Sequence, residues 1–443
     1  GGGVRTPLIV ASALRRAQRV GLEELCLMDV DAERLRIFGA LSQQVANDAG
    51  SPVRITMTTQ ARTALEGARY AVMTFRAGGE RGRVFDERVA LRLGVLGQET
   101  TGAGGFAMAM RSIPALLEYA ELAEEVSPGA WIINFTNPAG LVTQALFESG
   151  FPRTIGICDS ANGAQNAIAS WLGVAPERLQ AEVFGLNHLS WARRVLLDGR
   201  DALEPLLRDP AFLSGTLQRL FDPELVQSVG MWLNEYLHYY YYSDRALAEI
   251  LDQGRTRGEE ILDWNQLLLD QLRGIDIEDD PQSAQLAYNN YMHHRIGTYM
   301  EHGESGGETA GITDVKADEG YAGVALSVIE GLETGTPVHT ALNVPNQGAI
   351  AGLRSDDIVE VSCKVDGQGV HSLPIGPIPE PQELLMRTVK LYERLAIKAI
   401  LSRSRAMAVR ALMVHPLVLS YSRGIELVDG YLAAHAEYVG AWS

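Results

Sequence analysis

Short apolar runs alternate with amphipathic helical stretches through the first half of the chain. After a helical pattern over residues 8–19, the apolar run Leu25-Cys26-Leu27-Met28 predicts a buried strand. Further apolar runs predict strands at 70–75, 131–135, 154–158 and 181–186. This alternation of strands and helices is typical of a parallel, Rossmann-like α/β sheet.

The second half of the chain has a mostly helical pattern. Thr256 and Glu259 have the spacing of a capping box, which predicts a helix over 257–273. The remaining patterns predict helices at 225–242, 381–402, 404–414 and 424–438, and a polar, Gly-rich excursion or lid at 276–318. We therefore expect a nucleotide-binding, Rossmann-like domain over residues 1–190 and a mainly helical α+β domain over residues 191–443.

The composition excludes some classes of partner and says little about the fold. The 443 residues include 38 Lys and Arg against 55 Asp and Glu, so the net charge is −17. Nucleic-acid backbones are bound by a surplus of cations, so a general nucleic-acid partner is excluded. No apolar run has the length that a membrane span needs. Three cysteines cannot all pair with one another, and we expect free thiols in a cytoplasmic protein.

The chain opens with Gly1-Gly2-Gly3 and carries no signal-peptide pattern. We expect these glycines to form the turn after a first strand that precedes Gly1. Glycines that lead into a helix let backbone amides bind a pyrophosphate, and a strand that ends in Asp29 places a carboxylate for a ribose diol. This is the logic of a dinucleotide site, and a generic βα turn is the alternative.

Polar loops follow several predicted strands. Arg76 and Arg83 lie in a segment of three arginines among glycines, which indicates an anion pocket in an acidic chain. A solvated loop is the alternative. The loop at 97–105 carries Gln-Glu-Thr-Thr-Gly before a helix, and Asn137 lies in the polar loop 134–138. Strand ends of this kind are where open α/β sheets bind ligands.

Two residues have the chemistry of a metal site. Cys158 and His188 both follow strands, and a thiolate and an imidazole can converge on one metal ion that keeps positions open for substrate. A buried inert cysteine with a core histidine, or a thiol nucleophile, are the alternatives. Tyr236 lies in an aromatic cluster, and a neighbouring cation would lower the pKa of a tyrosine so that it acts as a base.

Taken in this order, the motifs resemble glycoside hydrolase family 4, and within it the 6-phospho-β-glucosidases. The resemblance covers nearly the whole chain and is most specific at 98–102 and 185–188. It implies a lactate/malate dehydrogenase-like fold, tightly bound NAD⁺ and a divalent metal, usually Mn²⁺. The implied substrate is a small phosphorylated sugar glycoside, and we expect a homodimer or homotetramer.

The resemblance also implies a mechanism outside the two-carboxylate scheme of most glycosidases. NAD⁺ oxidises the sugar C3 hydroxyl, and the resulting ketone acidifies the C2 proton, which a tyrosine removes. The metal stabilises the enediolate as a Lewis acid. Elimination of the C1 leaving group, addition of water and reduction of the ketone then regenerate NAD⁺.

The family's functional residues match positions of this chain one by one. By resemblance, Cys158 and His188 are the metal ligands, Tyr236 is the base for the C2 proton, and Asp159 is a candidate general acid. The implied cofactor contacts are Gly1, Gly2, Gly3, Asp29 and Arg76, and the implied substrate contacts are Arg83, Asn137, Asn187 and Arg257.

Two departures from the family pattern lie on the expected substrate side. The glycine turn continues as Val4-Arg5-Thr6-Pro7, and Asp318-Glu319-Gly320-Tyr321 replaces an Arg-Gly-Gly element. A family 4 glycosidase for unphosphorylated or α-linked sugars therefore stays an alternative. So do a net NAD-dependent oxidoreductase of the lactate/malate dehydrogenase lineage and a nucleotide-bound sensor without turnover.

Overall fold

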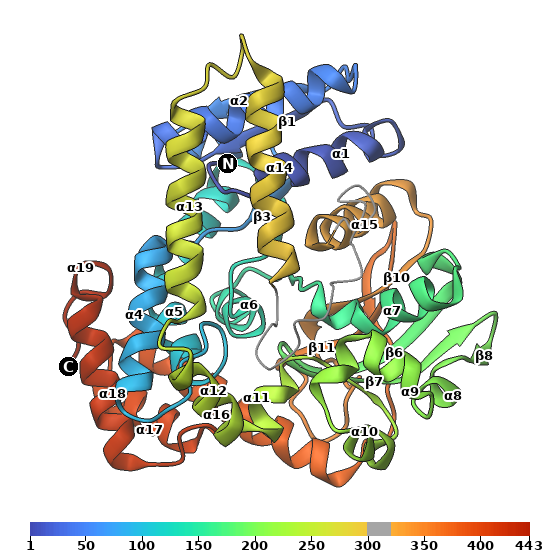
Figure 1. The fold of residues 1–443 in the computed structure, drawn as a ribbon, viewed down its shortest axis with the longest axis vertical. Coiled ribbons are helices and arrows are strands. Elements are labelled where there is room, and N and C mark those ends of the chain that lie inside the picture. Colours follow the sequence, from blue (N-terminus) through green and yellow to red (C-terminus); the bar gives the residue numbers. More distant parts are fainter. Residues whose placement is uncertain (299–319) are drawn as a thin grey trace.

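The computed structural model describes residues 1–298 and 320–443 (Figure 1). Its central feature is a six-stranded sheet with the strand order β12-β11-β10-β5-β4-β3. The first half of the chain supplies three parallel strands, namely β3 (Tyr70–Met73), β4 (Trp131–Asn134) and β5 (Thr154–Gly156). The second half adds three antiparallel strands, β10 (Val338–Pro345), β11 (Ile358–Asp366) and β12 (Gly369–Ser372). The predicted strands and the Rossmann-like fold class are confirmed.

The N-terminal segment forms a smaller layer beside this sheet. Strands β1 (Glu24–Met28) and β2 (Arg54–Thr58) pair in parallel. Helices α1 (Thr6–Val20) and α2 (Ala32–Asp48) flank them. Buried side chains of the two helices and the two strands form one apolar cluster. The helix expected over 8–19 and the strand expected over 25–28 are both present.

A third sheet carries the turn that holds His188. Strands β6 (Leu179–Leu186) and β7 (Leu189–Leu197) form an antiparallel hairpin, so Asn187 and His188 are its two-residue turn. His188, the second residue of the turn, has a positive φ of 62°, as the second central residue of a type II turn does. The short strands β8 (Arg200–Asp201) and β9 (Trp232–Leu233) extend β7 on its other side.

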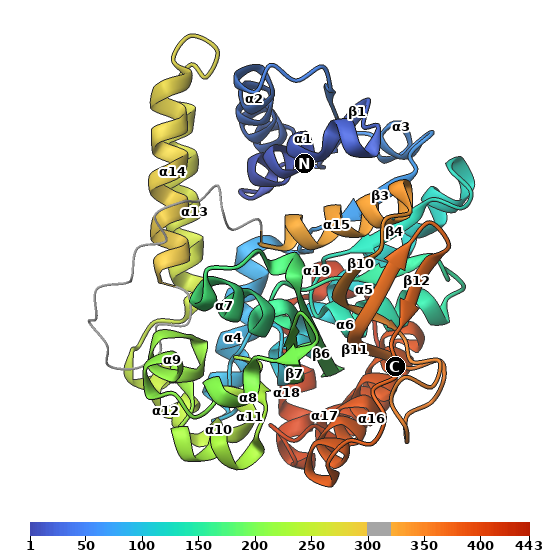
Figure 2. The same ribbon diagram turned by 90° about the vertical axis from the view of Figure 1, so that its right-hand side faces the viewer.

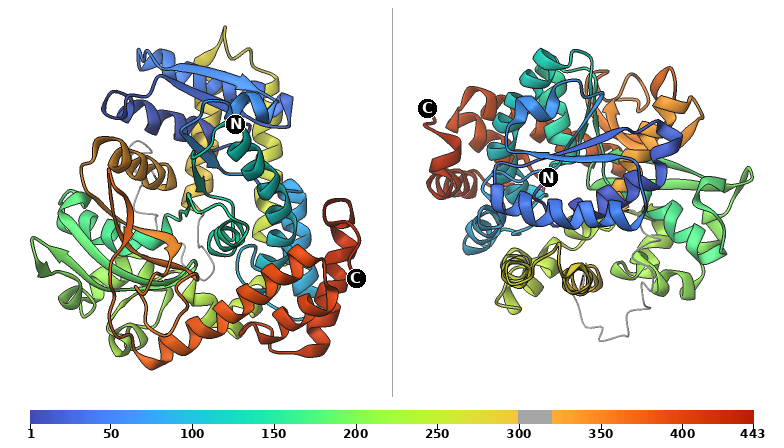
Figure 3. Two further views of the ribbon diagram at one scale, coloured as in Figure 1. Left: turned by 180° about the vertical axis from the view of Figure 1, so that it is seen from behind. Right: turned by 90° about the horizontal axis from the view of Figure 1, so that it is seen from above.

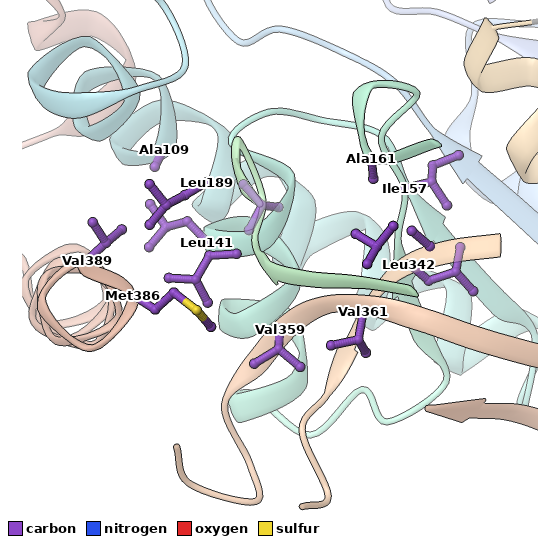
Figure 4. Packing of buried hydrophobic residues seen from close by; sticks show 14 of the residues in the cluster. Ala109, Leu141, Ile157, Ala161, Leu189, Leu342, Val359, Val361, Met386 and Val389 are labelled. Atoms are coloured by element: carbon purple, nitrogen blue, oxygen red, sulfur yellow. The ribbon is translucent and has the colours of Figure 1, made fainter. Parts of the chain in front are cut away.

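Apolar helices cover the central sheet and bury its core. Helix α6 (Ala139–Glu148) follows β4 directly, and it lies at the centre of the molecule in Figure 1. Leu141 of α6 packs in one cluster with Val359 of β11 and Met386 of α16 (Figure 4). Figure 3 shows from behind how α16 (Glu380–Ser402), α17 (Arg405–Val414) and α18 (Tyr421–Ala434) lie against α4 (Gly79–Arg92) and α5 (Gly102–Val126).

A helical hairpin stands beside the N-terminal layer (Figure 2). It consists of α13 (Arg257–Arg273) and α14 (Pro281–Gly297). Both halves of the predicted capping box are present at Thr256 and Glu259, and the helix has the predicted bounds. Side chains of both helices pack against Val4 and α2 in one buried cluster, so the hairpin joins the N-terminal layer to the rest of the fold.

The structure corrects two predicted segments. The single helix expected over 225–242 is wrong, because α10 (Pro223–Val229) ends at Gly230, whose φ of 66° stops the helix. The chain then forms β9 and the short α11 (Leu237–Tyr241). The excursion expected over 276–318 contains the helix α14, and its residues 299–318 lie outside the described residues.

The remaining helices connect the strands or lie in the second half of the chain. They are α3 (Ala61–Leu65), α7 (Gly163–Leu172), α8 (Leu203–Leu206), α9 (Pro210–Gly215), α12 (Ser243–Asp252), α15 (Gly320–Thr334) and α19 (Ala436–Val439). None of the helices in the described ranges is both long and apolar enough to span a membrane. The domain boundary near residue 190 stays a prediction, and β10 to β12 return to the sheet of the first half across it.

Candidate active site

Three strand ends bring the predicted metal pair together. Cys158 follows β5, and His188 lies in the turn between β6 and β7. The Cys158 Sγ is 3.6 Å from the His188 Nε2, and both residues are buried. Bonds of about 2.3 Å to sulfur and about 2.0 Å to nitrogen at a tetrahedral metal place the two ligand atoms about 3.5 Å apart. The observed spacing fits one cation held by both side chains.

Burial sets the protonation of both side chains in the absence of a cation. Burial lowers the pKa of His188 to about 3, so its imidazole is neutral and able to bind a metal. Burial, with Asp159 and Glu360 nearby, raises the pKa of the Cys158 thiol well above its usual value. A bound divalent cation counteracts this by stabilising the thiolate. Outside residues 299–319, the pair has no third His, Cys, Asp or Glu with which to form a complete ligand set.

The aromatic ring of Tyr236 lies directly on this pair. Its ring centroid is 3.8 Å from that of His188, and the two planes are nearly parallel at 13°. Asn234 fixes the approach, since its side-chain oxygen accepts the Tyr236 backbone N–H at 3.0 Å. The Asn234 amide also donates to the hydroxyls of Ser160 and Ser190, which belong to the segments of Cys158 and His188. One buried amide therefore connects all three candidate residues.

Asn187 is joined to a carboxylate that sequence reasoning missed. The Asn187 amide donates to Glu360 Oε1 at 3.2 Å, and the Asn343 amide donates to the same oxygen at 3.0 Å. Glu360 is fully buried, and burial raises its pKa to about 7. Asn343 and Glu360 are opposite each other on β10 and β11. Polar residues within the apolar runs 338–345 and 358–366 were the available signal.

The loop that contains Asn137 lies against the same turn. The peptide bond between Asn137 and Pro138 is cis. The Asn137 side chain accepts the backbone N–H of Ala139 at 3.3 Å, and the next residue, Gly140, donates its N–H to the Asn187 oxygen at 3.4 Å. Asp159 follows Cys158 directly, with its Oδ1 3.9 Å from the sulfur. Asn137, Asp159 and Asn187 thus belong with the metal pair and Tyr236.

Arg76 and Arg83 are held by one partly buried glutamate, Glu99 of the Gln-Glu-Thr-Thr-Gly loop. Arg76 contacts one oxygen of Glu99 at 2.5 Å, and Arg83 contacts the other at 3.2 Å. Burial alone would raise the pKa of Glu99, but the two arginines reverse the shift and hold it at about 2. Glu99 also acts electrostatically on His188, so this ion cluster adjoins the metal pair. Arg76, the predicted cofactor contact, shares this glutamate with Arg83, and its cofactor role stays a prediction.

Arg257 approaches this cluster from the first turn of α13. Its guanidinium lies over the Trp264 ring at 4.7 Å and donates to Thr298 Oγ1 at 3.0 Å. Burial lowers the pKa of Arg257, and the positive charges of Arg83 and Arg295 lower it further. Glu260 pairs with Arg257 at 3.2 Å and offsets part of this lowering. The cations of α4, α13 and α14 act on one another in one region, which favours the binding of an anion there.

The glycine turn lies at the end of β1, as a dinucleotide site requires. The Gly2 backbone N–H donates to Asp29 Oδ2 at 2.8 Å. A Cβ added at Gly1 would lie 2.6 Å from the Met28 backbone nitrogen, and one at Gly2 would lie 2.9 Å from the Asp29 carboxylate. Gly3 accepts the Thr6 N–H at 2.9 Å, and Arg5 supplies no side-chain cap to α1. The turn and the uncapped helix start fit a pyrophosphate and a ribose.

Comparison with known proteins decides the family. The model for the family 4 glycosyl hydrolases matches residues 1–174, and the model for the family 4 C-terminal domain matches residues 183–418. The chain belongs to glycoside hydrolase family 4. A probable 6-phospho-β-glucosidase of Bacillus subtilis is 30% identical to this family 4 chain, over 99% of the chain and 96% of the relative. The expected family is confirmed.

Solved family 4 structures share the whole fold. A 6-phospho-β-glucosidase from Thermotoga maritima, solved with NAD and glucose-6-phosphate, superposes with a TM-score of 0.83 at 29% identity, over 99% of this chain and 98% of that one. A 6-phospho-α-glucosidase from gut microorganisms, solved with NAD and Mn²⁺, has a TM-score of 0.81 at 25% identity, over 100% of this chain and 98% of that one.

Proposed function

We propose that this family 4 chain hydrolyses the glycosidic bond of 6-phospho-β-glucosides with the help of NAD⁺ and a divalent metal, preferably Mn²⁺. The observation that carries the proposal is the stack of Tyr236 on His188 beside Cys158, with an arginine cluster next to it. A metal-binding pair, a candidate base and an anion-binding region are what this chemistry needs side by side.

Each group of residues has a distinct task in this proposal. Cys158 and His188 hold the metal, while Asn137 and Asn187 hold sugar hydroxyls. Tyr236 takes the C2 proton, and a cation held by Cys158 and His188 would lower the pKa of Tyr236 and so favour the tyrosinate. Asp159 is the candidate acid for the leaving group. The substrate phosphate binds at Arg83 and Arg257. Arg76 contacts the cofactor and pairs with Glu99, which also pairs with Arg83.

The glycine turn and Asp29 hold the dinucleotide. When bound, NAD⁺ supplies reversible oxidation of the sugar at C3, and the divalent cation supplies Lewis acidity at the sugar oxygens. The chain itself contributes position, because its buried amides and hairpin turn fix the side chains before substrate arrives. Both groups fit the residues described above.

The β configuration is favoured by two observations. The motif at 98–102 carries Thr100 and Thr101, whereas α-specific members tend to have Cys there. A probable 6-phospho-β-glucosidase of Bacillus subtilis and a 6-phospho-β-glucosidase of Thermotoga maritima are 30% and 29% identical over 99% of this chain, whereas a phospho-α-glucosidase of Clostridium acetobutylicum is 28% identical over the same share. A homodimer or homotetramer in the cytoplasm stays a prediction.

An activity screen tests the proposal. Aryl glucosides of both anomers, each with and without a 6-phosphate, are incubated with the protein, NAD⁺, Mn²⁺ and a thiol reductant that protects Cys158. We expect release of the aryl group from the 6-phospho-β-glucoside alone. Preference for an α-linked or an unphosphorylated substrate would replace the proposed specificity, and no release from any substrate would contradict the proposal.

A further inference from the structure

One buried carboxylate outside the metal pair, Glu87, binds Arg83 and the backbone next to Arg257. Glu87 lies one helical turn after Arg83 on α4 and is only 2% exposed. Its Oε1 accepts the Arg83 Nε–H at 2.9 Å. Its Oε2 accepts the backbone N–H of Gly258 at 2.8 Å. Gly258 is the residue directly after Arg257, so the two oxygens of Glu87 connect the two arginines.

The contact of Glu87 with the Gly258 N–H holds the first turn of α13 against α4. Backbone N–H groups in the first turn of a helix have no partner within the helix, and a negative charge there is stabilising. Thr256 caps the N–H of Glu259 from within the same segment. Glu87 reaches the Gly258 N–H from another helix, and thereby anchors the turn that carries Arg257 onto α4.

Close packing makes this contact dependent on a glycine. A Cβ added at Gly258 would lie 2.5 Å from the Glu87 Oε2 and 3.1 Å from the Arg83 Cγ. The helix start could not then approach α4 as closely as it does. The position of Arg257 relative to Arg83 therefore depends on Glu87 and on the absence of a side chain at Gly258.

We propose that Glu87 is a positioning residue that sets the spacing of Arg83 and Arg257 and so determines the affinity of the site for the sugar phosphate. The inference rests on the proposed function, since it assigns the phosphate to these arginines. Glu87 acts through its two partners and makes no contact with substrate itself.

Two substitutions test the spacing by different routes. In Glu87→Gln the side chain keeps its shape but has a single acceptor oxygen for two donors, so its new NH₂ group opposes either Arg83 or the Gly258 N–H. Gly258→Ala leaves Glu87 intact and forces the helix start away. We expect each variant to raise the KM for an aryl 6-phospho-β-glucoside by about tenfold or more, because charge-assisted contacts to the phosphate are lost. We expect kcat and the NAD⁺ affinity to stay within about twofold of wild type, because the metal pair and Tyr236 are untouched.

A neighbouring ion pair offers a matched control. Arg88 donates its Nε–H to Glu259 at 2.7 Å, and so also joins α4 to the first turn of α13 without touching Arg83 or Arg257. Arg88→Gln removes this partly exposed ion pair, which contributes little, and keeps both Glu87 contacts, so KM should stay at the wild-type value. Glucose-6-phosphate affinity, measured by calorimetry on each variant with NAD⁺ and Mn²⁺ present, should fall in parallel with the rise in KM.

The outcomes separate this inference from the proposed function. If the wild type prefers phosphorylated substrates but both variants keep its KM, the role of Glu87 is refuted. It is equally refuted if kcat or NAD⁺ affinity falls while KM stays constant, because that pattern reports general disruption. If the wild type shows no preference for phosphorylated over unphosphorylated glycosides, the assignment of the phosphate site in the proposed function is refuted, and the role of Glu87 in phosphate binding is refuted with it.

Discussion

The buried carboxylate of Glu360 predicts a measurable pH dependence of stability. Burial raises its pKa to about 7 in the folded protein, whereas an unfolded glutamate has a pKa of 4.5. The folded state thus binds more protons between these two values, and stability falls as the pH rises through that window. A shift of about 2.5 pKa units at 1.36 kcal/mol each corresponds to about 3 kcal/mol, present below about pH 4.5 and lost above about pH 7.

The substitution Glu360→Gln removes this titration and keeps the acceptor for Asn187 and Asn343. The variant should therefore gain stability relative to wild type as the pH rises from 5 to 8. An unfolding entropy of about 2.1 cal/mol/K per residue gives about 0.9 kcal/mol/K for a chain of this length unfolding as one unit, so the difference in Tm should change by about 3 °C. Scans with a chelator and without NAD⁺ separate this effect from pH-dependent metal binding. Parallel curves of Tm against pH for the two proteins would refute the reasoning.

The remaining predictions concern the site. Cys158→Ser and His188→Ala should each lower Mn²⁺-dependent hydrolysis by more than about a hundredfold, since substitutions of residues that only hydrogen-bond metal ligands already cost about 10- to 100-fold. The NAD⁺ affinity, measured by fluorescence titration, should stay at the wild-type value. Unchanged rates would refute the metal assignment. Tyr236→Phe keeps the stack on His188 but should abolish exchange of the substrate C2 proton with solvent deuterium, followed by NMR, and normal exchange would indicate another base. Replacing Arg257 by Gln should raise KM about tenfold for phosphorylated substrates only, and an equal rise for unphosphorylated glycosides would contradict the phosphate site. Gly2→Ala should weaken NAD⁺ binding in the same titration, because its Cβ would lie 2.9 Å from the Asp29 carboxylate, and wild-type affinity would argue against the turn as the dinucleotide site.

The sequence predicted the central sheet well and placed Cys158 after β5, at a strand end where parallel sheets bind ligands. It also predicted that Cys158 and His188 converge, but not that His188 lies in the turn of an antiparallel hairpin. The capping box at Thr256 and Glu259 predicted α13 with its bounds, since a local hydrogen-bond motif depends little on the rest of the fold. The continuous helix over 225–242 was wrong because Gly230 and the pairing of Trp232 with β7 outweigh helical periodicity.

Contacts between distant segments could not be predicted. Glu360 meets Asn187 across 173 positions and Glu87 meets Gly258 across 171, and no local pattern links such pairs. The same holds for the stack of Tyr236 on His188, which arises from the packing of α11 against a hairpin turn. The proposed phosphate affinity and the proposed base both depend on these long-range contacts, so the resemblance alone could name the residues but not how they are held.

Hydrolysis in D₂O tests the central claim most directly. The protein is incubated with an aryl 6-phospho-β-glucoside, NAD⁺ and Mn²⁺, and the glucose-6-phosphate product is examined by NMR while absorbance at the NADH band is followed. An internal redox cycle predicts deuterium at C2 of the product, with aryl release and no net accumulation of NADH. Aryl release with protium retained at C2, or stoichiometric NADH, would contradict the account.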